Sequence, residues 1–345
     1  IKTSTETLNK KLFPRPDPTI TRTGLLVLHA MEEAVKDSGL KPEELATTGT
    51  ALVGATTVGG MCLTDEIFRD AHEKNEGTPY TSSYDYASVT LAAQKRFGIL
   101  GEVSTINTAC SSSANAIAFG ARLIRHGFAR RAIVGGADSL AKFTINGFNA
   151  LNILSKDPCA PFDRNRNGLN LGEGAAFLVL EQEEDAKGKK VYAEFAGSGN
   201  SNDAFHPSSI SADGEGPFLS MREALERSGL KAADIGYINA HGTGTENNDE
   251  TESIAMQRLF GNPPPFASTK SFTGQTLGAA GAIEAVYSVL NLQHQEIYPS
   301  LEFREPIPST NFVPVARYRK QALQHVMSNS FGFGGNCTTL IFSKA

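Results

Sequence analysis

The chain has 345 residues, of which 40% are hydrophobic and 33 are glycines. This composition is typical of an α/β protein with a large core, and it excludes fibrous and repeat architectures. The formal net charge is -5, and neither half carries the dense block of lysine and arginine that follows a phosphate backbone. Nucleic acid is therefore not expected as a partner.

Four cysteines lie far apart, without CxxC spacing or the density of a disulfide scaffold: Cys62, Cys110, Cys159 and Cys337. The histidines form no HExxH-type cluster, so no metal is expected. No apolar run approaches the roughly 18 residues needed to cross a bilayer, and no signal segment opens the chain. We expect a cytoplasmic protein with reduced thiols that is neither exported nor in a membrane.

The first part of the chain predicts an arm, a helix and a strand. Ile1 to Ile20 is polar, contains several prolines and has no period, which indicates an irregular arm. Apolar residues then recur at helical spacing over Gly24–Ser38, and Gly39 is placed to end that helix. Thr50–Ala55, with the sequence TALVGA, predicts a short buried strand.

Strands and helices alternate through the rest of the chain, which predicts a layered and largely parallel α/β architecture. The charged stretch Glu181–Lys190 divides the chain into two halves, residues 1–181 and 182–345. The first half is expected to contain strands Val103–Asn107, Arg131–Gly135 and Ala175–Glu181 and a helix over Ser111–His126. The second is expected to contain strands Val191–Gly197, Ile235–Ala240, Val326–Asn329 and Thr338–Ser343 and helices Pro217–Ser228, Asp249–Leu259 and Leu277–His294.

Cys110 follows a predicted strand and begins a predicted helix, in the segment Ile106-Asn-Thr-Ala-Cys-Ser-Ser-Ser-Ala114. Unpaired N–H groups and the helix dipole favour a thiolate at such a position, so we expect the pKa of this thiol to be lowered. The turn is the thiol counterpart of a nucleophile elbow. The alternative is a small buried cysteine, which is the interpretation we favour for the other three.

His241 ends a predicted apolar strand and is followed by Gly-Thr-Gly-Thr, ending at Thr245. The glycines let the backbone approach a ligand closely and the hydroxyls can hydrogen-bond one. An imidazole at a strand end can transfer a proton or donate to an oxyanion, although an isolated histidine is often only a structural hydrogen-bonding group.

Glu284 lies among small and apolar residues of a predicted helix, where a buried carboxylate needs a cation or donors. Lys270 is the obvious partner in sequence; the alternative places both groups at the surface. Near the end of the chain, Phe331 and Phe333 stand in a glycine-rich turn, as core residues or as a mobile gate.

Six segments, in this order, resemble the β-ketoacyl-acyl carrier protein synthases of the type I/II group: NTACSSSANAI, GGADS, PFDRNRNGLNLGEGAAFLVLE, NAHGTGT, KSFTGQTLGAAGAIEA and NSFGFGG. Each motif alone is weak, but together they cover nearly the whole chain. The resemblance implies a thiolase-like fold with α-β-α-β-α layers built from two similar halves. The family's opening strand has no counterpart after Ile1, so we expect one N-terminal strand to be missing.

The resemblance also assigns roles to individual residues. It implies that Cys110 is the acyl-accepting nucleophile, that His241 is the first catalytic histidine and that Lys270 organises the electrostatics of the site. Further implied residues are Phe333 as gate, Asp249, Glu252 and Glu284 as supporting acids, and Thr243 and Thr245 as contacts of a phosphopantetheine arm. The backbone N–H groups of Cys110 and Phe333 would form the oxyanion hole.

One residue departs from the family pattern. Gln275 occupies the place of the second catalytic histidine in Lys-Ser-x-x-Gly-His. A carboxamide can donate a hydrogen bond there, but it cannot titrate. The implied activity is condensation of an acyl-enzyme with malonyl-acyl carrier protein in fatty acid or polyketide biosynthesis, without a metal or nucleotide cofactor.

Two other activities stay open. A thiolase would need a second catalytic cysteine, for which Cys337 is the one candidate. A non-elongating or decarboxylating subunit of a heterodimer is compatible with Gln275, although such subunits usually lack the cysteine that stands here at 110. The expected partners are an acyl carrier protein and, in a homodimer, a second copy of the chain.

Overall fold

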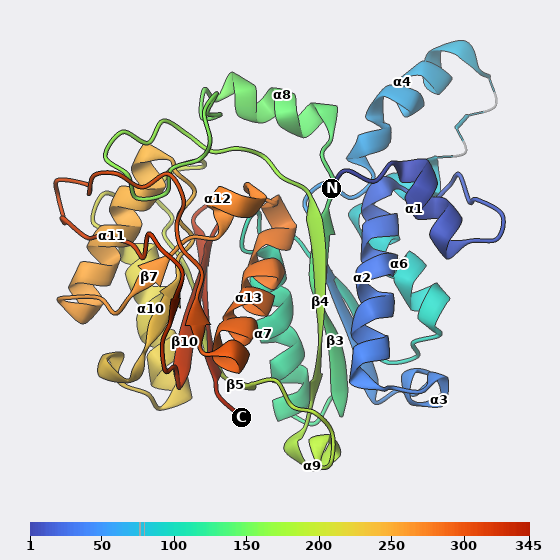
Figure 1. The fold of residues 1–345 in the computed structure, drawn as a ribbon. Helices are drawn as coiled ribbons and strands as arrows, with labels where there is room; N and C mark the ends of the chain where they lie inside the picture. Colours follow the sequence, from blue (N-terminus) through green and yellow to red (C-terminus); the bar gives the residue numbers. More distant parts are fainter. Residues whose placement is uncertain (76, 79) are drawn as a thin grey trace.

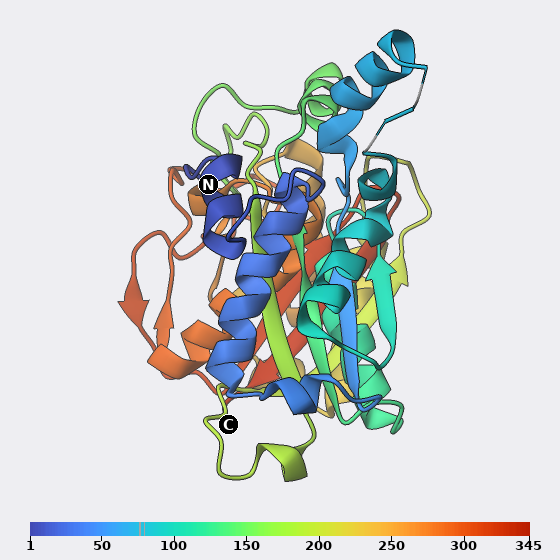
Figure 2. The same ribbon diagram turned by 90° about the vertical axis from the view of Figure 1, so that its right-hand side faces the viewer.

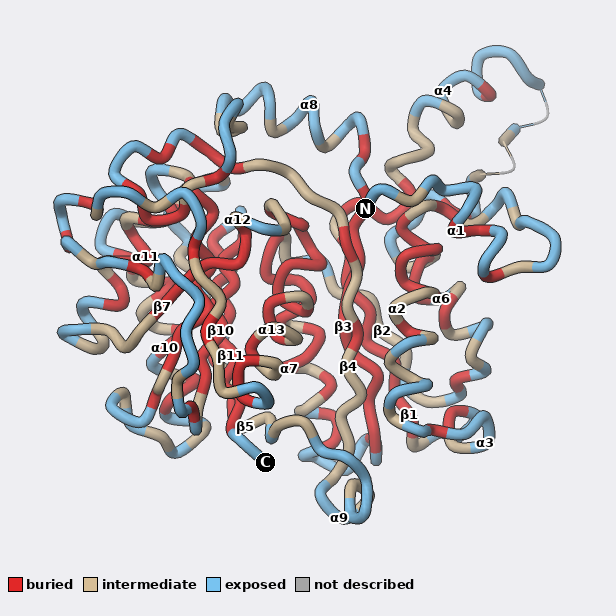
Figure 3. Tube along the Cα trace, in the orientation of Figure 1, coloured by how far each residue is buried: buried red, intermediate tan, exposed pale blue. Residues whose placement is uncertain are grey.

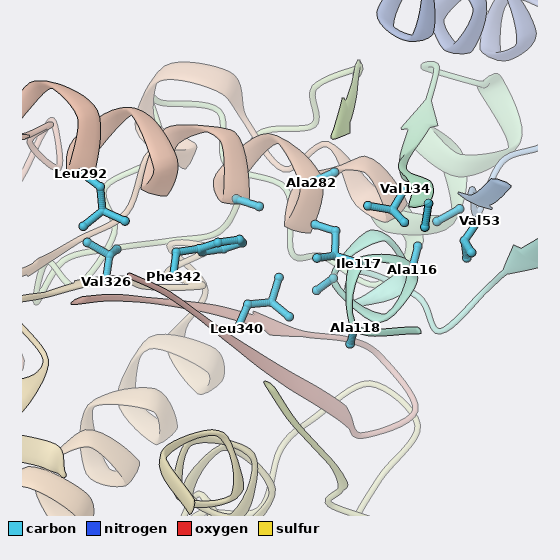
Figure 4. Close-up of a cluster of buried hydrophobic side chains, with 14 of the residues drawn as sticks. Val53, Ala116, Ile117, Ala118, Val134, Ala282, Leu292, Val326, Leu340 and Phe342 are labelled. Carbon is cyan, nitrogen blue, oxygen red and sulfur yellow. The ribbon is translucent and has the colours of Figure 1, made fainter. Parts of the chain in front are cut away.

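Two buried helices form the middle layer of the molecule. The computed structural model describes residues 1–75, 77–78 and 80–345. Helices α7 (Ser112–Arg125) and α13 (Ala280–His294) pack against each other between two sheets. Figure 3 shows that this middle layer is buried along most of its length. Side chains of both helices and both sheets meet in one hydrophobic cluster (Figure 4), so the two halves share a core.

Small residues let these helices approach their neighbours. A Cβ atom at Gly120 of α7 would lie 2.3 Å from a methyl group of Val134. A Cβ atom at Gly281 of α13 would lie 2.7 Å from the backbone nitrogen of Ala114. Since real Cβ atoms do not make such contacts, glycine sets the spacing of the middle layer.

The first sheet has the strand order β2-β1-β3-β4. Its strands are β1 (Thr50–Ala55), β2 (Val103–Ile106), β3 (Arg131–Asp138) and β4 (Gly174–Glu181). β1 is parallel to β2 and β3, whereas β4 is antiparallel to β3. Helices α2 (Arg22–Ser38) and α6 (Tyr86–Phe97) cover the outer face (Figures 1 and 2).

The second sheet has the strand order β5-β11-β10-β6-β7. Its strands are β5 (Glu194–Asn202), β6 (Tyr237–Asn239), β7 (Phe266–Ala267), β10 (His325–Phe331) and β11 (Asn336–Ser343). Helices α10 (Glu215–Ser228) and α11 (Glu246–Phe260) lie on its outer side (Figure 1). The predicted thiolase-like layers of two similar halves are confirmed.

Each sheet has one strand that runs against the others, β4 in the first and β11 in the second. The prediction of a largely parallel architecture is therefore confirmed, with these two strands as exceptions. A short glycine-rich turn joins β10 to β11, and so short a connection requires antiparallel strands. On its far side β11 pairs with β5, whereas the matching strand β4 has no second neighbour among the described residues.

The predicted irregular arm contains a helix, α1 (Thr5–Leu12). Ser4 caps its N-terminus, and Leu8 and Leu12, four residues apart, are buried against α2. Two apolar positions in a two-turn helix are too few to give a recognisable period, which is why the sequence did not predict it. The guanidinium of Arg22 bonds both the Glu173 carboxylate and the carbonyl of Thr3, which holds the arm in place.

The other predicted elements are present, with small shifts of their bounds. The strand predicted from Val191 begins at Glu194, and the helix predicted from Leu277 opens with a 3-10 turn over Leu277–Ala279. The remaining elements are α3 (Pro42–Leu45), α4 (Thr64–Glu73), α5 (Thr81–Tyr84), α8 (Lys142–Ala150), α9 (Glu183–Ala186), α12 (Lys270–Thr273), β8 (Glu296–Ile297), β9 (Arg319–Lys320) and 3-10 turns at Met61–Leu63 and Ala232–Asp234. In the described part of the chain, no helix combines the length and the apolar character that a membrane span needs.

Two glycine substitutions test the spacing of the middle layer. Gly120→Ala should lower the melting temperature by about 2 °C or more, because the added methyl group meets a buried valine. Gly147→Ala lies in the exposed helix α8, where an added Cβ meets nothing within 4 Å. This substitution should leave the melting temperature unchanged or raise it. Differential scanning calorimetry measures both. Equal melting temperatures for the two variants would contradict this account of the packing.

Candidate active site

Cys110 lies in the turn between β2 and α7, two residues before the helix begins. Ala109 before it has a φ of 53°, in the left-handed region that residues with a Cβ seldom adopt. The Ser112 side chain stabilises the turn through two hydrogen bonds. Its hydroxyl donates to the carbonyl of Ala109 at 2.5 Å and accepts from the Thr108 N–H at 2.9 Å. The thiol is therefore held in a fixed and strained turn.

Burial raises the pKa of the Cys110 thiol to about 11. The positive charge of Lys270 and a hydrogen bond from the backbone N–H of Phe333 act in the opposite direction. The sequence-based expectation of a lowered pKa is thus wrong, because the thiol is only 7% exposed and a thiolate would lose its hydration there. The resting thiol is protonated at neutral pH.

His241 follows β6 and is buried, and one carboxylate on α11 holds its backbone. The N–H groups of His241 and Gly242 each donate to the Glu252 carboxylate at 2.9 Å. The side-chain amide of Asn329 donates to the same carboxylate at 3.1 Å. Burial raises the pKa of Glu252 to about 7, and these three donors oppose that rise. Glu252 therefore orients the histidine loop through the backbone.

Lys270 is only 1% exposed, and three acceptors surround its ammonium group. Nζ donates to the carbonyl of His241 at 2.7 Å, forms an ion pair with Glu284 and lies 3.3 Å from Nδ1 of His241. A charged ammonium group has three hydrogens and no lone pair, so Nδ1 must accept and the imidazole proton must be on Nε2. Lys270 thus selects the tautomer of His241.

The charge state of His241 follows from the same contacts. Burial and the adjacent charge of Lys270 hold the pKa of His241 well below its ordinary value. The imidazole is therefore neutral across the physiological range, with an Nε2–H available as a donor. Burial raises the pKa of Glu284 to about 7 against the opposing charge of Lys270.

Asp249 fixes the loop that carries Thr243 and Thr245. Its carboxylate accepts from the N–H of Gly244 at 3.1 Å and from the N–H of Phe162 at 2.7 Å. The hydroxyls of Thr243 and Thr245 lie 2.9 Å apart. The predicted supporting acids are thus all buried: Asp249 and Glu252 bond the backbone of the histidine loop, and Glu284 bonds Lys270.

Phe333 stands at the tip of the turn between β10 and β11 and is 36% exposed. The turn passes close to the nucleophile, since a Cβ atom at Gly332 would lie 2.7 Å from the carbonyl of Thr108 and 3.1 Å from the nitrogen of Cys110. The Phe333 ring stacks on Phe148 of α8 at 5.7 Å between centroids. The sequence did not indicate Phe148, because α8 shows no apolar period.

The other cysteines have different surroundings. Cys159 is buried, its thiol donates to the carbonyl of Thr243 at 3.1 Å, and burial raises its pKa to about 12. Cys337 is buried in β11, and burial raises its pKa as well. Cys62 is half-buried in a 3-10 turn. Cys159 and Cys337 lie at no strand-to-helix turn, whereas Cys62 lies in the connection from β1 to α4, two residues before that helix begins.

Comparisons with known proteins add to this geometry. The sequence matches two family models, "Beta-ketoacyl synthase, N-terminal domain" over residues 4–186 and "Beta-ketoacyl synthase, C-terminal domain" over residues 192–304. The chain belongs to the β-ketoacyl synthase family.

Among curated relatives of this β-ketoacyl synthase is 3-oxoacyl-[acyl-carrier-protein] synthase 2 of Rhizobium meliloti, 37% identical over 91% of this chain and 79% of the relative. Among solved structures it is similar to the ishigamide ketosynthase/chain length factor, with a TM-score of 0.91 and 30% identity over 96% of this chain and 84% of that one. It is also similar to AntDE:AntF, a type II PKS acyl-carrier protein in complex with its ketosynthase, with a TM-score of 0.87 and 26% identity over 93% and 85% of the two chains.

Gln275 distinguishes this β-ketoacyl synthase from the family pattern. It is only 2% exposed, and its backbone is held by an N–H bond to the carbonyl of Asn170 at 2.7 Å and by an N–H bond from Gly172 at 2.9 Å. Its side-chain oxygen has no hydrogen-bond partner within the described part of the chain. A buried carboxamide in this state can hydrogen-bond a ligand without any change of charge.

The pKa of Cys110 predicts how its alkylation depends on pH. Iodoacetamide reacts with thiolates, so a pKa near 11 makes the alkylation rate rise about tenfold per pH unit from pH 7 to 10. Peptide mass spectrometry follows the site, with Cys110→Ala confirming the assignment. A rate that levels off below pH 9 would show that the thiol is activated in the resting enzyme.

Proposed function

We propose that this chain is a 3-oxoacyl-[acyl carrier protein] synthase, an acyltransferase that condenses an acyl-enzyme with malonyl-acyl carrier protein. The supporting observation is that the turn carrying Phe333 packs against the backbone of the nucleophile turn, 3.1 Å from the nitrogen of Cys110 at the Cβ position of Gly332, while Lys270 bonds the carbonyl and contacts Nδ1 of His241. These contacts support a site in which Cys110 would be the nucleophile, Phe333 an oxyanion donor and neutral His241 a second donor. The family and the name of the Rhizobium meliloti relative support the same activity.

The first step transfers the acyl group to the enzyme. The sulfur of Cys110 attacks the thioester carbonyl of the acyl carrier, and the carrier thiol leaves with the proton of the Cys110 thiol. Negative charge develops on the carbonyl oxygen, where the N–H groups of Cys110 and Phe333 would stabilise it. Burial raises the pKa of the Cys110 thiol in the free enzyme. We therefore expect this thiol to lose its proton only as its sulfur bonds to the acyl carbon.

The second step forms the carbon–carbon bond. The malonyl group loses carbon dioxide, and the electron pair of the broken bond forms an enolate on its thioester. Nε2–H of His241 and the side-chain amide of Gln275 would donate to the enolate oxygen. The enolate carbon then attacks the acyl carbonyl, and Cys110 leaves as a thiolate, which takes up a proton from water to restore the resting thiol. These steps use only the groups named, so we expect no metal or nucleotide cofactor.

The proposed substrates are carried on the phosphopantetheine arm of an acyl carrier protein. The hydroxyls of Thr243 and Thr245, beside His241, are the groups we assign to that arm. AntDE:AntF shows a ketosynthase with its carrier protein, which supports this partner. The proposed location is the cytoplasm, where Cys110 would stay reduced.

We further propose that the protein is a homodimer. β2 pairs with β1 on one side, and its outer edge has no strand partner among the described residues. Such an edge can pair with a second copy of the chain. Light scattering should give twice the chain mass, and a single-chain mass would exclude this proposal.

A second candidate function is a partner subunit that decarboxylates malonyl groups without elongating the chain. Gln275 favours it, and so does the similarity to a ketosynthase/chain length factor assembly. The presence of Cys110 favours the synthase. A thiolase is less favoured, because Cys337 lies buried within β11 rather than facing Cys110 from an open turn.

Intact-protein mass spectrometry tests the proposed function. Acyl-carrier should add one acyl group to the wild type and none to Cys110→Ala, since no other thiol shares the nucleophile turn. Subsequent malonyl-carrier should remove that group as condensed product. A wild type that stays unmodified, or an acyl group that malonyl-carrier never discharges, would reject the synthase in favour of the partner subunit.

Gln275→His should raise condensation more than acylation. Acyl transfer needs Cys110 and the oxyanion hole, whereas decarboxylation needs both enolate donors, and one preorganised donor is worth on the order of 10²–10³ in rate. The measurement compares single-turnover acylation with condensed product formed by the same two proteins. Unchanged or lower condensation would mean that Gln275 is already a competent donor.

A further inference from the structure

Asn336 begins β11, directly after the glycine-rich turn, and its side-chain oxygen is surrounded by donors from other parts of the chain. Oδ1 lies 2.7 Å from the hydroxyl of Ser111, 2.8 Å from the amide nitrogen of Asn115 and 3.1 Å from the amide nitrogen of Asn200. Its Nδ2 makes one long contact of 3.4 Å, with the oxygen of Asn200. The carboxamide therefore acts mainly as an acceptor.

Two of these donors belong to the nucleophile turn. Ser111 directly follows Cys110, and Asn115 lies one helical turn further along α7. The amide of Asn115 also donates to the hydroxyl of Thr108 at 2.9 Å, on the other side of the cysteine. The side chain of Asn336 is thus connected to the chain both before and after the nucleophile.

The backbone of Asn336 closes the glycine-rich turn. Its carbonyl accepts from the N–H of Gly332 at 2.8 Å, and within the turn the N–H of Gly335 donates to the carbonyl of Gly332 at 3.1 Å. Phe333 lies inside this turn, directly after Gly332, whose Cβ position is 3.1 Å from the backbone nitrogen of Cys110. One residue therefore shapes the turn with its backbone and holds the nucleophile turn with its side chain.

We propose that Asn336 is a positioning residue that fixes the N–H of Phe333 relative to the N–H of Cys110. The inference rests on the proposed function, in which these two groups form the oxyanion hole. The two donors come from different halves of the chain, and the Asn336 side chain is a direct polar link between their turns. A misplacement of about 1 Å can cost on the order of 10²-fold in rate at a reacting centre.

Asn336→Ala should slow acylation of Cys110 about tenfold or more, since the oxyanion donors lose their fixed spacing. Malonyl decarboxylation without an acyl primer should change less than about twofold, because its donors, His241 and Gln275, lie outside both turns. Asn336→Asp keeps an acceptor for the same donors, so its acylation rate should stay within about threefold of wild type. A purely structural role would lower both reactions together.

Asn202→Ala is the matched control. The Asn202 amide donates to the carbonyl of Gly334 at 3.2 Å, so it holds the same turn, and among the described residues no side-chain hydrogen bond joins it to α7. Its loss should slow acylation less than about threefold. If it slows acylation as much as Asn336→Ala does, disorder of the turn explains the loss and the proposal is rejected.

Three further results would overturn the proposal: acylation of Asn336→Ala at the wild-type rate, a parallel loss of decarboxylation, or an Asn336→Asp variant no faster than Asn336→Ala. If Asn336→Ala lacks a native melting transition, Asn115→Ala, which removes one of the two contacts to α7, is measured instead and should show the same selective loss. A wild type that takes up no acyl group rejects the proposed function itself, before any variant is compared.

Discussion

The buried ammonium group of Lys270 is the interaction on which the site depends. A lysine that is 1% exposed needs an acceptor for each of its three hydrogens, and Glu284, the carbonyl of His241 and Nδ1 of His241 supply them. Two of these acceptors belong to the histidine. The group that neutralises the buried Glu284 therefore also sets the orientation and tautomer of the imidazole, and one ion pair determines both the charge and the hydrogen-bonding direction of the site.

The pKa values of the site form a consistent set around this ion pair. Lys270 lowers the pKa of His241 and partly offsets the rise that burial causes at Cys110 and Glu284. At neutral pH the imidazole is neutral and the thiol is protonated. The site thus offers donors rather than a strong base, which suits chemistry in which charge develops on substrate oxygens.

The sequence predicted the elements whose pattern is long or sharply bounded. The strand Thr50–Ala55 has the predicted bounds, and Gly39 ends α2 in the left-handed conformation. The motifs identified the family, because six segments in a fixed order exclude other protein families far more strongly than any single segment does. The structure places His241, Lys270, Glu252 and Glu284 in one buried network, and the pairing of Lys270 with Glu284, expected because a buried carboxylate needs a cation, is confirmed.

Other features depend on tertiary contacts that a sequence does not display. The direction of β11 follows from the length of a turn, and the raised pKa of Cys110 follows from burial by segments far away in the chain. Helix α8 has no fully buried residue, so it has no apolar stripe to reveal it or its contact with Phe333. The contacts of Asn336 join residues more than 220 positions apart, which no local pattern encodes.

The burial of α7 between two sheets limits how the reaction can proceed. A helix enclosed on both faces cannot tilt or slide without breaking the core that both halves share. Cys110 therefore keeps a fixed position in the molecule, and each acyl group must be carried to it. The β10–β11 turn meets the nucleophile turn beyond the N-terminal end of α7, where Gly332 approaches Cys110. Movement that brings substrate to the thiol therefore belongs to these surface turns, while the middle layer stays unchanged.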